Sequence, residues 1–290
     1  MSGSALDLLE EGVLSSGENY KVYRLVTPAE KVVPKQVKQY ITASLGFDDY
    51  RKYVNDQNYW RLYYRAAFDN QGAVDHLYLA EVNGEFAARV WFAYSRRSGF
   101  GNFGNVYTEA EHRQKGLMSI LMRHCVEGFN SCDAKMLCCS TGSKIAAASY
   151  VKSGFHLIYG GETGPLCLLK KEYGDHFFDI AKKYYSDNEI VKVRPGTIDD
   201  QYDCDKILDK LPAMRENKPS PPPEAGCFVT EYRIAYQEVL NGNGKILVAE
   251  NRAGVCVGYS WQLNLFGRTV SHTVLHPDCR DQKNMMLNFN

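Results

Sequence analysis

The sequence predicts a mixed α/β (α+β) protein, in which a twisted and mostly antiparallel sheet is flanked by helices. Three observations lead to this prediction. Strand-like and helix-like patterns of apolar residues alternate over the first 170 residues. The dipeptide Asn83-Gly84 separates two strand-like segments, which favours an antiparallel hairpin because both positions of a type I′ turn need a positive φ. A similar hairpin pattern returns near residue 250, which indicates a second, partial copy of the same unit.

The elements around the first hairpin follow from local patterns. Residues 1–18 look like a loose leader, and a strand is expected over about residues 20–26. Helical patterns follow over about residues 34–45 and, with many aromatic side chains, over about residues 49–68. The hairpin covers residues 77–95, and the strand after it ends at Val106, Tyr107 and Thr108.

The next helix is predicted over about residues 114–129, because apolar residues recur there every four positions: Leu117, Leu121, Cys125 and Phe129. After it the pattern predicts, in order, a buried strand at 135–140, a helix at 143–152 that Gly154 ends, and strands at about 155–160 and 165–171.

The second half of the chain repeats the start of the first. Ala249-Glu250 corresponds to Ala80-Glu81, and Arg280 corresponds to Arg113, with offsets of 169 and 167 residues. We therefore expect a leader at 1–18, an N-terminal domain at 19–172, a linker helix at 173–189 and a partial C-terminal domain at 190–290.

Composition excludes several classes of function. The chain has 290 residues, and its 34 Lys+Arg balance its 34 Asp+Glu. Nucleic-acid binding normally rests on a basic excess, so no nucleic-acid partner is expected. No apolar run approaches the roughly 20 residues that a membrane-spanning helix needs, and the N-terminus carries no basic leader. We therefore expect a cytoplasmic protein without a membrane partner.

The nine cysteines form no Cys-x-x-Cys pair, and several lie in apolar stretches. This usage is typical of reduced thiols in a protein core, and we expect no metal cofactor. A zinc site or a catalytic thiol is the alternative.

The segment from Thr108 to Ser119 carries the clearest signal for chemistry. A strand ends, a polar turn follows, and a helix begins near Gly116. Unpaired N–H groups and the helix dipole make such a helix start an anion site, and Gly116 lets a ligand approach the backbone. Arg113 and Lys115 add positive charge. A pyrophosphate cradle is one interpretation, and an ordinary helix start with exposed basic residues is the other.

A second segment, residues 146–155, combines small residues with Tyr150 and with Gly154-Phe155. The small residues allow the helix to pack closely against its neighbours. By itself, Tyr150 is typical of a half-buried packing residue.

Together the two segments resemble the GNAT acyltransferases. The resemblance rests on Arg113-x-x-Gly116 at a strand-to-helix turn, followed about 34 residues later by Tyr150-x-x-x-Gly154-Phe155. It covers about residues 20–171 and implies a GNAT-like fold. The acyl-CoA loop of that family, Q/R-x-x-G-x-G/A, corresponds here to Arg113, Gln114, Lys115, Gly116, Leu117 and Met118. Met118 replaces the last small residue of the loop and leaves less room beside the pyrophosphate.

The resemblance implies an N-acetyltransferase that moves an acetyl group from acetyl-CoA to a primary amine of a small molecule, by direct attack in a ternary complex. Backbone N–H groups near Tyr107 and Thr108 would polarise the thioester. Tyr150 would protonate the departing CoA thiolate, and a glutamate would accept the proton of the amine. Glu109 is the first candidate for this base, because it adjoins the strand end. The others are Glu81 and Glu111, and a solvated surface charge is the alternative for all three.

The acceptor is expected to meet an aromatic region. Tyrosine rings there suit a cationic or aromatic amine, although helix packing explains the same residues. They are Tyr50, Tyr53, Tyr59, Trp60, Tyr63, Tyr64 and Trp91. Nearby carboxylates that would attract an ammonium group, or cap helices instead, are Asp48, Asp49 and Asp56.

The second copy is expected to be catalytically inactive. Lys283 stands where the first copy has Gly116, and no tyrosine-bearing helix follows. Its outer strand, near residues 269–275, leaves an open sheet edge that docks on the first domain or pairs with another chain as a homodimer. Two alternatives to the small-molecule acetyltransferase stay open: an acyl-CoA-binding or scaffold protein without turnover, and a tandem GNAT transferase that acts on a peptide.

Overall fold

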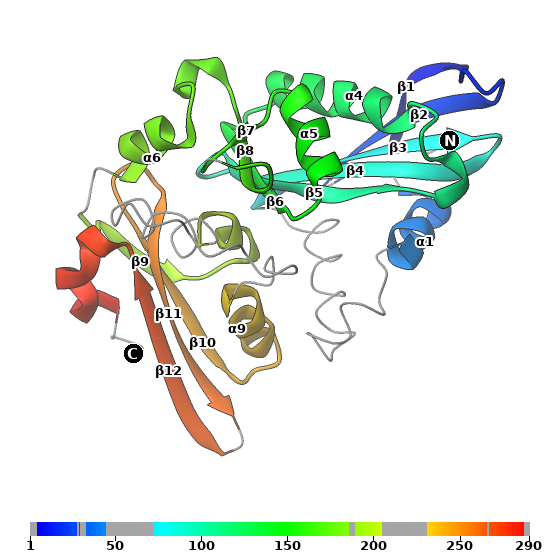
Figure 1. The fold of residues 1–290 in the computed structure, drawn as a ribbon. Helices are drawn as coiled ribbons and strands as arrows, with labels where there is room; N and C mark the ends of the chain where they lie inside the picture. The colour runs from blue at the N-terminus through cyan, green and yellow to red at the C-terminus, as the bar shows by residue number, and fades with distance from the viewer. Residues whose placement is uncertain are drawn as a thin grey trace.

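The computed structural model describes residues 5–27, 29, 33–44, 72–159, 161–185, 189–204, 231–265 and 267–286. Within these ranges the chain forms an eight-stranded sheet and a four-stranded sheet, with helices packed against them (Figure 1). This arrangement confirms the expected mixed α/β architecture.

The N-terminal segment is a β-hairpin. Strand β1 (Leu6–Val13) pairs antiparallel with β2 (Asn19–Thr27), and Gly17 lies in the turn between them with a φ of 85°. Leu14 is buried in the core and holds this turn against the rest of the sheet. The expectation of a loose leader over residues 1–18 was therefore wrong for residues 5–18, the part of it that the structure describes. Apolar residues of this segment pack against the domain, and its backbone pairs with β2 instead of with water.

The large sheet is antiparallel except at one junction. Its strand order is β1-β2-β3-β4-β5-β6-β8-β7, and among the described strands only β5 and β6 are parallel neighbours. Asn83 and Gly84 have φ values of 51° and 93°, which confirms the predicted turn of the first hairpin. The remaining strands are β3 (Ala73–Val82), β4 (Glu85–Ser95), β5 (Phe100–Thr108), β6 (Met136–Thr141), β7 (His156–Leu157) and β8 (Gly164–Leu169).

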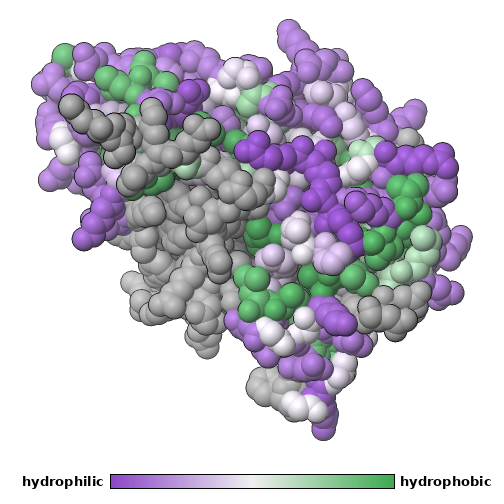
Figure 2. Space-filling view, turned by 180° about the vertical axis from the view of Figure 1, so that it is seen from behind, coloured by the Kyte–Doolittle hydropathy of each residue, from purple (hydrophilic) through white to green (hydrophobic). Residues whose placement is uncertain are grey.

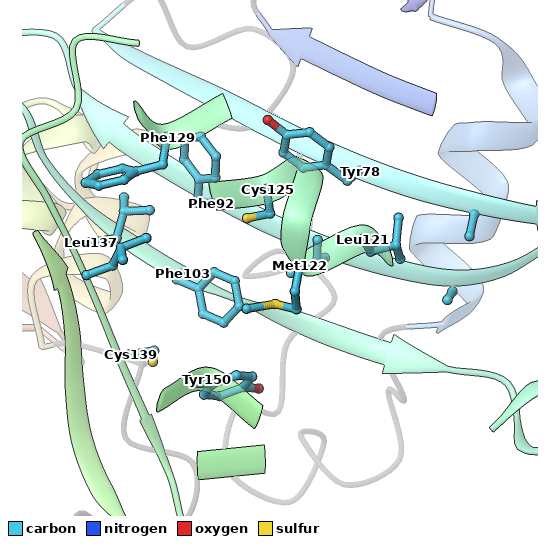
Figure 3. Packing of buried hydrophobic residues seen from close by; sticks show 14 of the residues in the cluster. Tyr78, Phe92, Phe103, Leu121, Met122, Cys125, Phe129, Leu137, Cys139 and Tyr150 are labelled. Atoms are coloured by element: carbon cyan, nitrogen blue, oxygen red, sulfur yellow. The ribbon is translucent and has the colours of Figure 1, made fainter. Parts of the chain in front are cut away.

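Helices cover both faces of this sheet. Helix α1 (Lys35–Ser44) lies on one face, while α4 (Leu117–Ser131) and α5 (Lys144–Lys152) lie on the other (Figure 1). The apolar residues predicted to recur along α4 are buried against β3, β4 and β5, where they pack on Tyr78, Phe92 and Phe103 (Figure 3). Ser143 begins α5, because its hydroxyl accepts a hydrogen bond from the N–H of Ala146 at 3.3 Å.

Close contact between α4 and the sheet depends on Gly128. A Cβ atom at this position would lie 1.7 Å from the hydroxyl of Tyr78, which is itself buried. We expect Gly128→Ala to lower the free energy of unfolding by about 1–3 kcal/mol, the usual cost of overpacking a core. Urea titration measures this loss, and the double variant with Tyr78→Phe should recover most of it. A double variant as unstable as Gly128→Ala alone would show that another contact causes the loss.

The second sheet has the same strand order as part of the first. Strands β9 to β12 pair consecutively and antiparallel, as β2 to β5 do. Both hairpins also shift register at the equivalent dipeptide, Ala80-Glu81 and Ala249-Glu250. The shared strand order and the shared register shift support an internal duplication, and the domain boundaries stay predictions.

The remaining helices and strands are α6 (Phe177–Tyr185), β9 (Lys192–Pro195), α9 (Glu231–Leu240), β10 (Gly244–Glu250), β11 (Cys256–Leu265) and β12 (Arg268–Leu275). The 3₁₀ segments are η1 (Ala110–His112), η2 (Lys171–Tyr173), η3 (Ile198–Asp200) and η4 (Pro277–Met286).

The two sheets share one apolar core and one polar cluster. Phe100 and Met136 of the large sheet belong to the same buried cluster as Val248 and Tyr259 of the small sheet. Beside it, Glu250 accepts hydrogen bonds from Arg97 at 2.7 Å and from Arg194 at 2.8 Å. The second sheet thus packs against the first unit, and β12 lies at its outer edge, as predicted.

The face of the molecule in Figure 2 is largely hydrophilic where it is coloured. Apolar residues form separate patches, the largest of them in the half that holds the second sheet. No helix in the described part of the chain is both long and apolar enough to cross a membrane.

Candidate functional site

Strands β5 and β6 diverge in the middle of the large sheet. They pair at Phe100–Met136, Gly101–Leu137 and Asn102–Cys138, and no pair follows along these two described strands. Strand β5 nevertheless continues to Thr108 and β6 to Thr141. Beyond Asn102 the described part of β5 thus has no ladder pairing with β6, and this is the end of β5 at which the resemblance places the thioester.

A β-bulge lies in β5 next to this opening. Between the pairs Arg89–Tyr107 and Trp91–Gly104, β4 advances by two residues and β5 by three. Asn105 has a φ of 52°, unusual for a residue other than glycine. A bulge bends its strand and re-aims the side chains that follow it. This bulge was not predicted, although Gly104-Asn105 inside a strand is a signal for one.

The loop between β5 and α4 leaves an open helix start. Gln114 and Gly116 have positive φ values of 62° and 88°, and Gly116 is the residue that begins α4. A Cβ atom built on Gly116 would meet no atom within 4 Å. The space beside Gly116 is therefore open at the positive end of this 15-residue helix.

The side chains of the loop point in different directions. Arg113 donates from Nε to the carbonyl oxygen of Thr108 at 3.0 Å, so it ties the loop to the strand end. Lys115 lies 2.7 Å from Glu18 of the N-terminal hairpin. Leu117 is buried, and Met118 is half-buried against the same core, whereas Gln114 is exposed. The Met118 side chain thus contributes to the core beneath the loop.

Tyr150 lies at the opening between the strands. Its ring packs edge-on against Phe103 of β5, with 5.1 Å between centroids, and beside Phe155 at 5.8 Å. Figure 3 shows Phe103, Cys139 and Tyr150 gathered at this end of the core. Burial raises the pKa of Tyr150, so its hydroxyl keeps its proton at neutral pH. The structure therefore brings the tyrosine together with the diverging strands.

The three candidate bases lie in different surroundings. Glu109 directly follows β5, is partly buried, and accepts a hydrogen bond from the Tyr107 hydroxyl at 3.2 Å. Glu111 is exposed on η1. Glu81 lies on β3, where it hydrogen-bonds Tyr23, and β4 separates it from β5. Of the three, Glu109 alone adjoins the strand end.

A buried arginine near the strand end was not predicted. Arg89 pairs with Tyr107 across β4 and β5, and its guanidinium lies 4.8 Å from the Tyr107 ring and 5.6 Å from the Tyr40 ring. It is 3% exposed. Its burial could not be predicted from local patterns, because arginine in a hairpin usually faces solvent.

Most of the expected acceptor region lies outside the described residues. Trp91 is described: it is buried on β4 and donates its indole N–H to Asp75 at 2.8 Å. The residues outside are Tyr50, Tyr53, Tyr59, Trp60, Tyr63, Tyr64, Asp48, Asp49 and Asp56. Among the described residues, no three His, Cys, Asp or Glu side chains lie together as a metal site requires.

Three solved structures illustrate the likeness to known proteins. The chain is similar to the catalytic domain of the Tetrahymena GCN5 histone acetyltransferase in complex with coenzyme A (12% identity, 54% of this chain and 96% of that one, TM-score 0.37). It is similar to the PaiA N-acetyltransferase of Thermoplasma acidophilum in complex with coenzyme A (8% identity, 51% of this chain and 99% of that one, TM-score 0.33). It is also similar to a GCN5-related N-acetyltransferase from Kribbella flavida (12% identity, 92% of this chain and 59% of that one, TM-score 0.38).

None of the curated proteins with which the sequence was compared matches it. The model of the acetyltransferase (GNAT) family matches residues 41–155, a range that contains β3 to β6, α4 and α5. The loop at Gly116 and the helix of Tyr150 both lie inside it. Residues 41–155 of this chain are therefore a domain of the GNAT acetyltransferase family.

Proposed function

We propose that the protein is an acyl-CoA-dependent N-acyltransferase that moves an acetyl group from acetyl-CoA to a primary amine of a small molecule. The observation that carries this proposal is the open helix start at Gly116, beside the divergence of β5 and β6, in a GNAT-family domain. A helix start with free N–H groups suits the pyrophosphate of the cosubstrate. The divergent strand end suits its thioester.

Each site residue then has a task. Arg113 to Met118 surround the pyrophosphate, and N–H groups near Tyr107 and Thr108 polarise the thioester carbonyl. Glu109, directly or through a water molecule, takes the proton of the amine, which attacks the carbonyl carbon. As the C–S bond breaks, Tyr150 gives its proton to the sulfur. Its raised pKa keeps this proton available at neutral pH.

The second unit has no catalytic role in this proposal. Strands β11 and β12 pair without a register shift from Gly258–Leu275 to Leu265–Arg268, so the bulge of β5 has no equivalent there. Lys283, which replaces the loop glycine, is exposed on η4. We assign this unit a structural role, since it shares a core with the first.

Ligand-induced stabilisation tests the cofactor site. A ligand at 100 times its dissociation constant stabilises a protein by about 2.7 kcal/mol. Acetyl-CoA should therefore raise the unfolding midpoint of the wild type by several degrees, at roughly 2–4 °C per kcal/mol. Gly116→Glu should abolish this shift, because it places a side chain and a negative charge at the helix start.

Gly84→Glu is the matched control. Gly84 has a nearly equal φ of 93° and equally open surroundings, but lies in a hairpin turn. This variant should keep the full shift despite the same backbone strain. Loss of the shift in both variants would show that the substitutions destabilise the protein and do not specifically block the cofactor site. No shift in the wild type would contradict the proposed function.

A further inference from the structure

The N-terminal hairpin contacts the loop that the proposed function assigns to the pyrophosphate. Glu18, at the turn of this hairpin, places Oε2 2.7 Å from Nζ of Lys115 and Oε1 3.5 Å from Nδ1 of His112. Ser16 donates its hydroxyl to the same carboxylate at 2.6 Å. Two basic groups of the loop therefore face one acidic group of the hairpin.

Further contacts fix the hairpin in this place. Glu10 of β1 bonds Arg123 and, at 2.9 Å, His124, both on α4. Leu14 anchors the turn in the core. Because α4 is the helix that begins at Gly116, the hairpin is attached to the element that carries the candidate phosphate site. These contacts fix the position of the hairpin and therefore hold Glu18 beside the loop.

The charge of Glu18 opposes an anionic ligand. Hydrogen bonds from Lys115 and Ser16 hold the pKa of Glu18 below its ordinary value, so the carboxylate is ionised at neutral pH. Its negative charge offsets the positive charge of Lys115. Phosphate groups that approach the helix start then meet a lysine whose charge already has a partner.

We propose that Glu18 sets the affinity of the cofactor site by competing with the phosphates of the cosubstrate for Lys115. This inference rests on the proposed function. The loop before a helix binds phosphate through backbone N–H groups, and Lys115 adds a positive charge to this site. Glu18 neutralises that charge when it pairs with Lys115. The hairpin thereby weakens the binding of CoA and hastens its release after transfer, because affinity changes act mainly on dissociation rates.

Calorimetric titration with CoA tests this role through a double-mutant cycle. Glu18→Gln keeps the size of the side chain and removes its charge. We expect it to tighten CoA binding by about three- to fivefold, the range of a partly exposed ion pair. Lys115→Gln should weaken binding, and Glu18→Gln should have no further effect in that background. Glu11→Gln is the control, since Glu11 is an exposed glutamate of the same hairpin.

The outcomes separate the two proposals. Unchanged or weaker binding of CoA to Glu18→Gln would overturn the inference while the cofactor site stands. Equal tightening by Glu11→Gln, or tightening by Glu18→Gln that persists without Lys115, would also overturn it, because either result reflects overall charge. Absence of CoA binding by the wild type and every variant would instead reject the proposed function itself.

Discussion

Replacing Tyr150 with phenylalanine is expected to lower kcat about 100-fold, the lower range for loss of a general acid. The ring packs against Phe103 and Phe155, and phenylalanine keeps both contacts. Only the proton donor is lost, so the leaving thiolate must take its proton from water. The affinity for acetyl-CoA should stay the same. Steady-state kinetics with an amine acceptor, combined with direct titration of acetyl-CoA, measures both quantities.

Tyr78→Phe is the matched control for this experiment. Tyr78 belongs to the same buried cluster, but it lies on β3 under α4, away from the divergence of β5 and β6. Its hydroxyl has no hydrogen-bond partner among the described residues, so its removal should leave kcat unchanged. An equal loss in both variants would point to packing. Full activity of Tyr150→Phe would remove this residue from the mechanism and favour the alternative of an acyl-CoA-binding protein.

Glu250→Gln is expected to lower the free energy of unfolding by about 2–4 kcal/mol at pH 7. Removing one partner of a buried ion pair costs about 3–5 kcal/mol, and partial exposure of Arg97 reduces this figure. The carboxylate of Glu250 holds Arg97, in the turn between β4 and β5, and Arg194 of the small sheet together. Its loss removes the carboxylate that both guanidinium groups share, while Arg194 keeps its hydrogen bonds to Asp200. Denaturant titration measures the loss.

The effect should depend on pH in a defined direction. Burial alone would raise the pKa of Glu250, but hydrogen bonds from Arg97 and Arg194 outweigh it and hold the pKa below its ordinary value of 4.5. A carboxylate with a lowered pKa contributes stability above its unfolded-state pKa and loses it as the pH falls through the folded-state pKa. The difference between wild type and Glu250→Gln should therefore shrink below about pH 4.5.

Glu189→Gln is the corresponding control, because Glu189 pairs with Arg252 while both side chains are more than half exposed. Such a pair contributes about 0–1 kcal/mol. Equal losses in Glu189→Gln and Glu250→Gln would show that the cluster between the sheets does not stabilise the protein as the structure indicates.

Local patterns in the sequence predicted most elements of the first unit. Apolar spacing along α4 and the Asn83-Gly84 turn each reflect one dominant local force, and both are confirmed. The position of Gly116 at the start of α4 could also be predicted, because a strand end followed by a glycine and an apolar helix allows few local conformations. Tyr150 needed the family resemblance, since its ring alone indicates packing as well as chemistry.

Other features depend on long-range pairing that local patterns do not reveal. The first strand was missed because its apolar residues are irregularly spaced, and its partner β2 decides its conformation. The bond between Glu18 and Lys115 joins residues 97 positions apart. Arg89 is buried because tyrosine rings from α1 and β5 enclose it. In each case the cause lies in tertiary structure.

The short junction of β5 and β6 also affects how the large sheet holds together. Among the described strands, only three residue pairs join the block of β1 to β5 to the block of β6 to β8, and just before them the N–H of Lys135 bonds the carbonyl oxygen of Gly99 at 2.7 Å. Parallel strands need a crossover connection, here through α4, so this junction joins segments that are far apart in the chain. A molecule lodged in the opening would touch both blocks at once and act as a clamp across this junction.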